Sequence, residues 1–231
     1  MLLPLHDEAP MRRLKQPSVT WGLIVITTAI FGLFQSGILG ALEPKFSLGF
    51  GLIPSVFFGL DTLDPAIAHA PAILTPLTSL FLHAGWMHLA GNMLFLWVFG
   101  DNVEDALGHD RFLAFYLVTG IIAGLAFAIL NQTTQSPLIG ASGAVSGVLG
   151  AYLVLYPKVA VFGLFLNVVP VRIPALWFIG GWFAFQLGHA LFDPNQAIAW
   201  VAHVFGVIAG VGIIFLLRLR SLNAVIRRIG K

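Results

Sequence analysis

The sequence predicts an all-α membrane protein, built as a six-transmembrane-helix bundle with a long interfacial first loop. Of the 231 residues, 58% are hydrophobic and only 10% are charged, with a mean hydropathy of +0.92. A soluble domain of this length cannot bury so much apolar surface. About 20 consecutive apolar residues span a bilayer as a helix. Six runs approach this length, at roughly 19–39, 86–104, 112–131, 139–156, 173–191 and 198–217.

Two further apolar stretches do not qualify as spans. The stretch from 40 to 78 is interrupted by prolines and acids, so we expect a long loop in or near the membrane interface; the interrupting residues are Pro54, Asp61, Asp64, Pro65, Pro71 and Pro76. The run at 159–169 is too short to cross. The expected organisation is therefore a cytoplasmic segment at 1–18, a transmembrane domain at 19–217 and a basic cytoplasmic tail at 218–231.

The basic residues predict the orientation. All but Lys45 fall at the N-terminus, in the loops after spans two and four, or at the C-terminus: Arg12, Arg13, Lys15, Arg111, Lys158, Arg172, Arg218, Arg220, Arg227, Arg228 and Lys231. The positive-inside rule then places both termini in the cytoplasm, as an even number of spans requires. We expect a multi-pass protein of a bacterial-type cell membrane. Its basic tail is expected to contact anionic lipid rather than nucleic acid.

Polar residues gather at one depth. In this topology spans two, four and six run inward from the outer face. His88 and Asn92 lie in the first two turns of span two, and Ser142 lies in the first turn of span four. His203 is about five residues into span six, or ~7.5 Å along the helix. Polar residues inside a membrane are functional candidates by default, so this shared shallow depth predicts a single water-reachable site.

Small residues indicate how that site is assembled. Span four carries Gly140, Gly143, Gly147 and Gly150, and span six carries Gly206 and Gly210. Such faces allow helices to approach closely in lipid, which would bring Ser142 within reach of His203. A hydroxyl beside an imidazole forms a nucleophile and its base. None of the ten acids lies inside span four or six, and Asp193 lies in the loop before span six. We therefore expect a Ser-His dyad rather than a Ser-His-Asp triad.

Acyl transfer also needs donors for the developing oxyanion. His88 and Asn92 are four residues apart, so they share a helix face, and the backbone N–H of Ser142 is a third candidate. The rival interpretation is a zinc site made from His83, His88, Asn92 and His203. It is disfavoured because Cys is absent, no acid lies nearby, and Asn is a poor zinc ligand. We expect neither a metal nor a cofactor.

Three motifs together resemble the rhomboid family of intramembrane serine proteases, over a match from about Thr78 to Leu217. They are the run from Thr78 to Leu89 followed by Asn92-Met93, the sequence Gly140-Ala141-Ser142-Gly143, and Ala202-His203 followed by Gly206 and Gly210. The resemblance implies Ser142 as nucleophile, His203 as base, and His88, Asn92 and the Ser142 amide as oxyanion stabilisers. It also implies that transmembrane proteins are cut near the outer face.

The chain departs from the family pattern twice. The first loop has no Trp-Arg pair between 40 and 78, so it is expected to be anchored differently. Ser146 stands four residues after the nucleophile, where some members have an aromatic residue that stacks on the base. The orientation of His203 must then be secured otherwise. Ser146 itself is expected to serve packing, and His83 to fix the loop before span two.

The sequence also allows other roles for these residues and other functions for the protein. Ser142 could serve as a helix cap and His203 as a structural histidine, and the span-five aromatics are expected mostly to face lipid: Trp177, Phe178, Trp182, Phe183 and Phe185. The main alternative function is a catalytically inactive rhomboid-like module that binds membrane proteins. A transporter or channel is the third reading. It would predict charges deep in the spans or paired inverted repeats, and the sequence shows neither.

Overall fold

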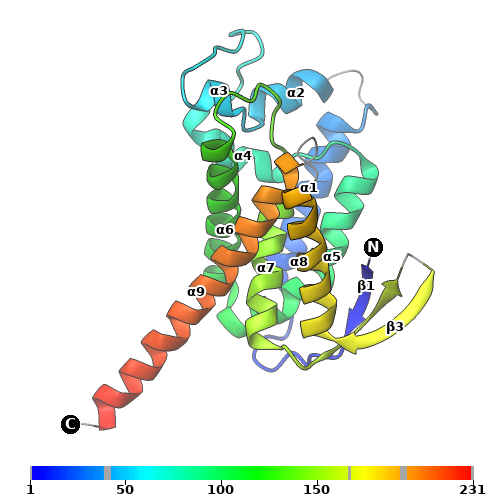
Figure 1. Cartoon of the computed structure of the whole chain (residues 1–231), viewed down its shortest axis with the longest axis vertical. Coiled ribbons are helices and arrows are strands. Elements are labelled where there is room, and N and C mark those ends of the chain that lie inside the picture. The colour runs from blue at the N-terminus through cyan, green and yellow to red at the C-terminus, as the bar shows by residue number, and fades with distance from the viewer. Residues whose placement is uncertain (1, 39–42, 166–167, 193–196, 230–231) are drawn as a thin grey trace.

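The computed structural model describes residues 2–38, 43–165, 168–192 and 197–229. A helix occupies each of the six predicted ranges (Figure 1). In chain order these helices are α1 (Ser18–Ile30) with its π-helical extension η1 (Phe31–Gln35), α5 (Trp86–Leu107), α6 (His109–Leu130), α7 (Ser142–Leu155), α8 (Ala175–Phe192) and α9 (Ala197–Ile229). The fold is mostly helical, as predicted.

Helix α7 lies at the centre of the bundle, in contact with α5, α6, α8 and α9 (Figure 1). All its residues from Gly143 to Tyr152 are buried. An apolar helix with small residues on several faces can be surrounded in this way. The core beside it includes Phe99, Tyr152 and Phe178, each fully buried. The first residue of α7, Ser142, is therefore held by the most enclosed element of the fold.

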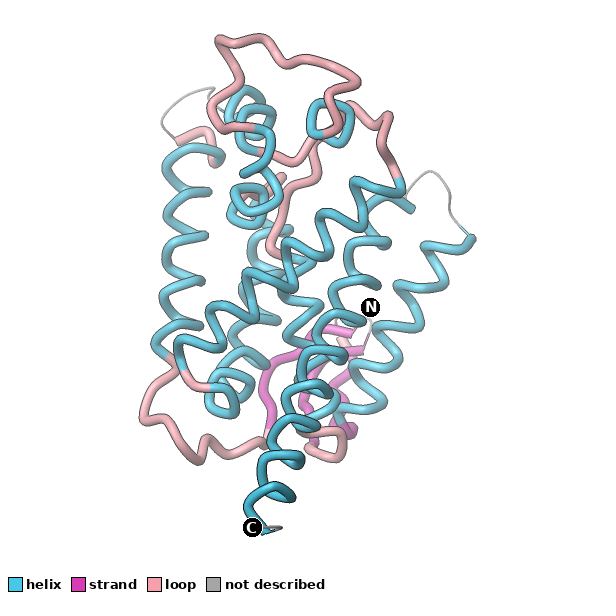
Figure 2. Tube along the Cα trace, turned by 90° about the vertical axis from the view of Figure 1, so that its left-hand side faces the viewer, coloured by secondary structure: helices cyan, strands magenta, loops and turns pink. Residues whose placement is uncertain are grey.

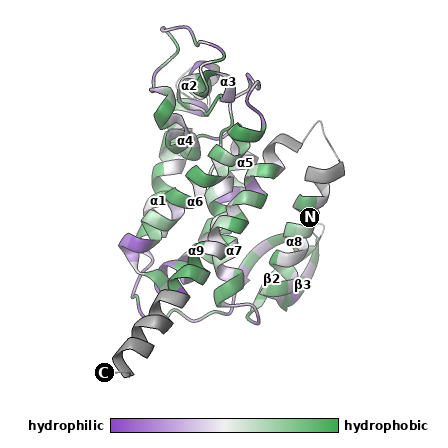
Figure 3. Cartoon of the chain, turned by 60° about the vertical axis from the view of Figure 1, so that its left-hand side comes forward, coloured by the Kyte–Doolittle hydropathy of each residue, from purple (hydrophilic) through white to green (hydrophobic). Residues whose placement is uncertain are grey.

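Length and hydropathy single out three stretches as membrane spans by themselves: Ser18–Gln35, His109–Leu130 and Trp200–Arg218. Figure 3 shows that apolar residues also run along much of the other helices. Helix α7 has only 14 residues, and α5 ends in buried acids. One of these, Glu104, accepts hydrogen bonds from the backbone N–H groups of Val19 and Thr20, at 3.0 and 2.7 Å. The count of six spans stays a prediction.

The described part of the stretch from 40 to 78 contains more helix than the predicted loop. Within its described part it contains four short helices: α2 (Glu43–Phe50), α3 (Pro54–Phe57), η2 (Ala72–Leu74) and α4 (Thr75–Thr78). A fifth, η3 (Ser79–Phe81), leads toward α5. Phe46 stacks on Phe34 of η1 at 4.8 Å between ring centroids and contacts Phe50 at 4.7 Å. Stacked aromatic rings thus anchor this segment, which lacks a Trp-Arg pair.

The prediction of an all-α fold is wrong in one respect. A three-stranded antiparallel sheet joins β1 (Leu2–Asp7), β2 (Ala160–Phe165) and β3 (Val169–Pro174) in the order β1-β2-β3, and it lies beside the helices (Figures 1 and 2). The run at 159–169 is too short to span but long enough for a strand. Its pairing partner β1 is 153 residues away in sequence, measured from Asp7 to Ala160. Local patterns do not reveal a pairing over that distance.

The two chain ends also differ from the expected segments. Within the segment expected at 1–18, residues 2–7 form a paired strand, and both carboxylate oxygens of Glu8 accept from Arg172 Nη2, each at 2.8 Å. At the other end, α9 continues without interruption to Ile229, so the basic segment from 218 extends the last helix. The boundaries at 18 and 217 stay predictions, although helical structure crosses the second one.

Candidate active site

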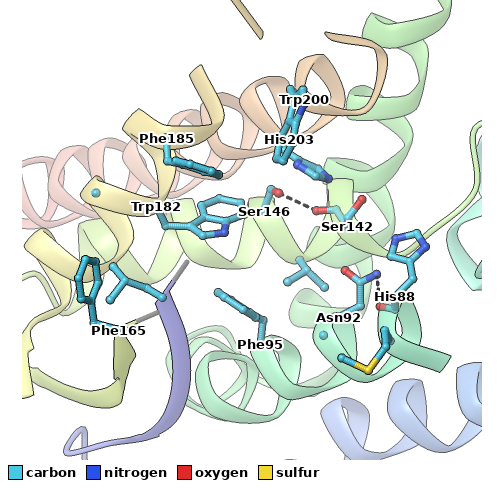
Figure 4. A pocket seen from close by; sticks show the side chains of 15 residues that line it. His88, Asn92, Phe95, Ser142, Ser146, Phe165, Trp182, Phe185, Trp200 and His203 are labelled. Atoms are coloured by element: carbon cyan, nitrogen blue, oxygen red, sulfur yellow. Dashed lines mark hydrogen bonds between the residues drawn. The ribbon is translucent and has the colours of Figure 1, made fainter. Parts of the chain in front are cut away.

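A pocket of about 500 Å³ opens among α5, α7, α8 and α9 (Figure 4). Ser142, His203, His88 and Asn92 all line it. In Figure 4 the side chain of Ser142 lies between the rings of His203 and His88, with Asn92 close by. The structure thus brings the four polar residues selected from the sequence to one cavity. The rest of its lining is mainly aromatic and aliphatic.

Gly140 shapes the chain just before Ser142. Its φ angle of 129° lies in the region that favours glycine. A Cβ at this position would lie 2.8 Å from Cε1 of His88 and 3.7 Å from the Ser142 hydroxyl. Any larger residue would therefore push against the imidazole. The Gly140 N–H donates to the Ser79 carbonyl at 2.9 Å, and this fixes the turn from which α7 begins.

His203 is carried to α7 by close helix packing. A Cβ on Gly206 would collide with the carbonyl oxygen of Gly143 and lie 2.9 Å from Cβ of Ser146. A Cβ on Gly210 would likewise collide with the carbonyl oxygen of Gly147. The small-residue faces of these two helices therefore meet, and the backbones of α7 and α9 are in direct contact.

Two tryptophans surround the His203 ring. Trp182 lies 6.1 Å from it between centroids and Trp200 lies 5.7 Å from it, the latter edge-on. The His203 ring thus has aromatic neighbours on α8 and α9, although position 146 is a serine. Nδ1 of His203 is buried and has no hydrogen-bond partner in the described part of the chain. Asp193, the acid nearest in sequence, lies outside the described residues.

No hydrogen bond joins the Ser142 hydroxyl to the His203 ring among the described residues. Catalytic hydrogen bonds are often long in free enzymes and tighten when substrate binds. The Ser146 hydroxyl donates to the Ser142 carbonyl at 2.6 Å, a bond between successive turns of α7, and Ser146 is only 1% exposed. Ser146 therefore has a local hydrogen-bond partner, and it also contributes to the lining of the pocket.

His88 and Asn92 both line the pocket from α5, and both have side chains that can form hydrogen bonds. The Asn92 amide donates to the His88 carbonyl at 3.1 Å, and Asn92 is 8% exposed. That bond uses one of its two N–H groups. Nδ1 of His88 accepts from the Ala84 N–H at 3.5 Å, and the opposite edge of the ring faces Gly140. Both residues therefore have hydrogen-bonding capacity beyond the contacts they make here.

His83 supports the segment before Ser142 from behind. It is fully buried, and its Nε2 accepts from the Ala141 N–H at 3.5 Å. Burial, aided by repulsion from His88, lowers the pKa of His83 to about 3. The ring is therefore neutral at physiological pH and can accept. This matches the expected role in fixing the loop.

Gln35 was not selected from the sequence, yet it holds His83. Its Oε1 accepts from the His83 N–H at 2.9 Å, and its Nε2 donates to Ser47 at 3.0 Å. The π-helical turn η1 ends at Gln35, which is only 4% exposed. An amide inside the first apolar run was the signal that could have identified it.

The aromatics of α8 divide into two groups. Phe178 is fully buried and Trp182 lines the pocket, which corrects the expectation that these rings mostly face lipid. Trp177 is 68% exposed, as expected of a lipid-facing residue. Phe185 is 53% exposed and also lines the pocket. One face of α8 therefore belongs to the site.

Comparison with known proteins gives the family. A family model described as the Rhomboid domain matches residues 72–220, which is more than half of the chain. The chain belongs to the rhomboid family. This stretch contains every rhomboid motif noted above and the four polar residues that the sequence predicted for the site.

Curated rhomboid proteins are similar over part of their length. The chain is 34% identical over 143 residues to "Rhomboid protein 1, mitochondrial" of Saccharomyces cerevisiae, covering 58% of this chain and 38% of that protein. It is 35% identical over 134 residues to "Rhomboid protease GluP" of Bacillus subtilis, covering 58% and 24% respectively. It is 41% identical over 78 residues to "Rhomboid-like protein 11, chloroplastic" of Arabidopsis thaliana, covering 33% and 27%.

The similarity thus spans at most about two fifths of these relatives. Their names and organisms place them in mitochondria, chloroplasts and a bacterium, so family membership does not determine the cellular compartment of this chain. Rhomboid membership and the apolar helices together make the chain an integral membrane protein.

Proposed function

We propose that this chain is an intramembrane serine endopeptidase that cleaves transmembrane segments of membrane proteins near the outer face of the bilayer. The observation that carries the proposal is the convergence of Ser142 and His203 on one pocket, through glycine contacts between α7 and α9. Family membership and a relative named as a protease support it.

The proposed reaction is acyl transfer through a dyad. The Ser142 hydroxyl attacks the carbonyl carbon of the scissile peptide while His203 accepts its proton. When the C–N bond breaks, His203 gives that proton to the leaving amine. A water molecule then attacks the acyl-enzyme and loses a proton to His203, which returns it to the Ser142 oxygen as the ester bond breaks. The proposal keeps the dyad that the sequence predicts, since no acid lies inside the predicted spans four and six.

His88, Asn92 and the Ser142 backbone N–H are proposed to stabilise the oxyanion. The Ser142 amide is at the first turn of α7, where helical N–H groups have no intrahelical partner. Asn92 retains its second amide hydrogen, and the imidazole of His88 lies at the Gly140 turn beside Ser142. Donors placed in advance around a developing charge contribute strongly to catalysis.

The membrane arrangement belongs to the same proposal. Six helices cross the bilayer, both termini face the cytoplasm, and the protein sits in a bacterial-type cell membrane. The partners are transmembrane protein substrates and membrane lipids, with anionic headgroups at the basic end of α9. No metal or cofactor takes part.

The test is cleavage of a transmembrane substrate by purified variants. We expect Ser142→Ala and His203→Ala each to abolish cleavage without unfolding the protein, and the double variant to be no worse than either, because the two residues act as a unit. Ser146→Ala is the matched control, one helical turn away, and should cleave normally. Normal turnover by Ser142→Ala would overturn the proposed mechanism, because Ser142 would then not be the nucleophile, whereas a folded wild type that binds but never cleaves the substrate would favour the inactive, client-binding alternative.

A further inference from the structure

The pocket that holds Ser142 reaches the sheet. Leu2 of β1 and Phe165 of β2 line it, and they are paired across the two strands. Figure 4 shows Phe165 at the opposite end of the cavity from Ser142 and His88, with Phe95 and Trp182 between them. The end of a sheet that sequence patterns did not predict therefore closes the far end of the candidate active site.

The sheet is fixed to the helices that carry the catalytic candidates. Asp7, at the other end of β1, is 5% exposed and accepts hydrogen bonds from the Tyr152 hydroxyl of α7 and, at 3.1 Å, from the Asn102 amide of α5. Helix α7 begins with Ser142, and α5 carries His88 and Asn92. The wall formed by Leu2 is thereby held in a defined position relative to the reacting groups.

The sheet also packs against α8. A Cβ on Gly163 of β2 would lie 2.7 Å from the ring of Phe178, which is fully buried. The ion pair between Glu8 and Arg172 further joins the segment after β1 to β3. The strands that carry Leu2 and Phe165 are therefore packed against the helices, and the exposed part of the Phe165 side chain, 47% of it, is available to a ligand.

The chemistry of the lining runs from polar to apolar along the pocket. Hydrogen-bonding side chains gather at the Ser142 end, whereas Phe95, Trp182, Leu2 and Phe165 make the remainder apolar. A polypeptide with its scissile bond at Ser142 would place apolar side chains, of the kind found in a membrane segment, toward the sheet. An apolar wall of fixed position discriminates such side chains by size.

We propose that the Leu2–Phe165 pair is a specificity-determining wall, which limits the size of one apolar side chain in the membrane-embedded part of the substrate. This inference rests on the proposed protease function. It assigns to the N-terminal strand a direct role in substrate choice.

The experiment measures cleavage of a substrate series in which a single Trp is moved stepwise along an otherwise constant transmembrane segment. All rates are divided by the fraction of protein that a fluorophosphonate labels at Ser142, which removes differences in folded enzyme. Wild type should discriminate against Trp at one depth. Leu2→Ala and Phe165→Ala should raise kcat/KM for that substrate alone by roughly 10-fold, since pocket size commonly contributes this much.

Two further variants make the result decisive. Leu2→Trp should act oppositely and reject Phe at the same depth, which misfolding does not explain. Leu5→Ala is the matched control, because Leu5 lies on the same strand, is 50% exposed and does not line the pocket. Its depth profile should equal that of wild type.

The failures are distinguishable. If wild type cleaves the series but Leu2 and Phe165 variants change every substrate equally, or none, the inference is overturned and the protease function stands. The inference is also overturned if Leu5→Ala reproduces the Leu2→Ala profile. Wild-type protein that neither labels at Ser142 nor cleaves any substrate overturns the proposed function, and this inference with it.

Discussion

At the scale of single residues, the site depends on polar atoms that are partly engaged by the protein itself. The Asn92 amide donates to the backbone carbonyl of His88, one turn earlier. The His83 ring accepts from the Ala141 N–H, and the Gln35 side chain accepts from the His83 N–H. Each of these bonds fixes the backbone or a ring next to Ser142. The arrangement is therefore built before a substrate arrives, as electrostatic stabilisation of an oxyanion requires.

Asn92→Ala tests the proposed oxyanion role. We expect kcat to fall by ~10²-fold or more with little change in KM, because the bond strengthens mainly in the transition state. Steady-state kinetics on a transmembrane substrate give both values. Asn131→Ala is a matched control, since the Asn131 amide makes the same kind of bond, at 2.9 Å to the Phe127 carbonyl, at the C-terminal end of α6. An unchanged kcat in Asn92→Ala would remove this residue from the proposed machinery.

At the scale of secondary-structure elements, the contact between α7 and α9 determines whether Ser142 and His203 meet. The glycines at 206 and 210 leave no room for a side chain against the α7 backbone. Dispersion and close backbone approach replace the hydrophobic effect as the force between helices in lipid. A single methyl group added at Gly206 or Gly210 would therefore disturb the packing of α9 on α7.

Gly206→Ala should separate the two helices. The new Cβ would collide with the Gly143 carbonyl, and we expect a loss of about 1–3 kcal/mol in stability together with a marked fall in kcat. Gly212→Ala is the control on the same helix, because a Cβ there meets nothing within 4 Å. Thermal unfolding in detergent and turnover measure the two effects. Equal behaviour of the two variants would contradict the packing account.

The contrast between helices and strands shows what the sequence could predict. Apolar runs located the helices, since hydropathy and span length are local properties, and the depth of Ser142 and His203 followed from the order of the helices. The sheet was missed because β1 and β2 pair across most of the chain. Leu2 and Phe165 therefore entered the site only with the structure, and Trp182, which was expected to face lipid, was placed in the pocket by the packing of α8. Gln35 was missed because one amide in an apolar run has no partner visible in sequence.

At the scale of the whole molecule, the distribution of basic residues along the bundle predicts the orientation of the protein. Figure 1 shows the segment with α2 and α3 at one end of the bundle and the last turns of α9 at the other. The bias of basic residues toward the α9 end predicts that this end is cytoplasmic. The end that carries α2 and α3 would then lie at the outer face.

Reporter fusions test this orientation. We expect a reporter after Lys231 to report the cytoplasm and one inserted near Asp64 to report the opposite side. Asp64 lies in the stretch at the α2–α3 end of the bundle and is exposed. Alkaline phosphatase and fluorescent-protein activities in intact cells distinguish the two sides. Finding both reporters on one side would contradict the topology and with it the proposed depth of cleavage.

The most direct test of the central claim, that His203 activates Ser142, is the rate at which a fluorophosphonate modifies the protein, with the modified residue located by mass spectrometry. The account predicts that wild type is labelled at Ser142 alone, and that His203→Ala is labelled at least ~10³-fold more slowly, because the hydroxyl loses its base. Labelling at Ser146, or an equal rate in His203→Ala, would contradict it.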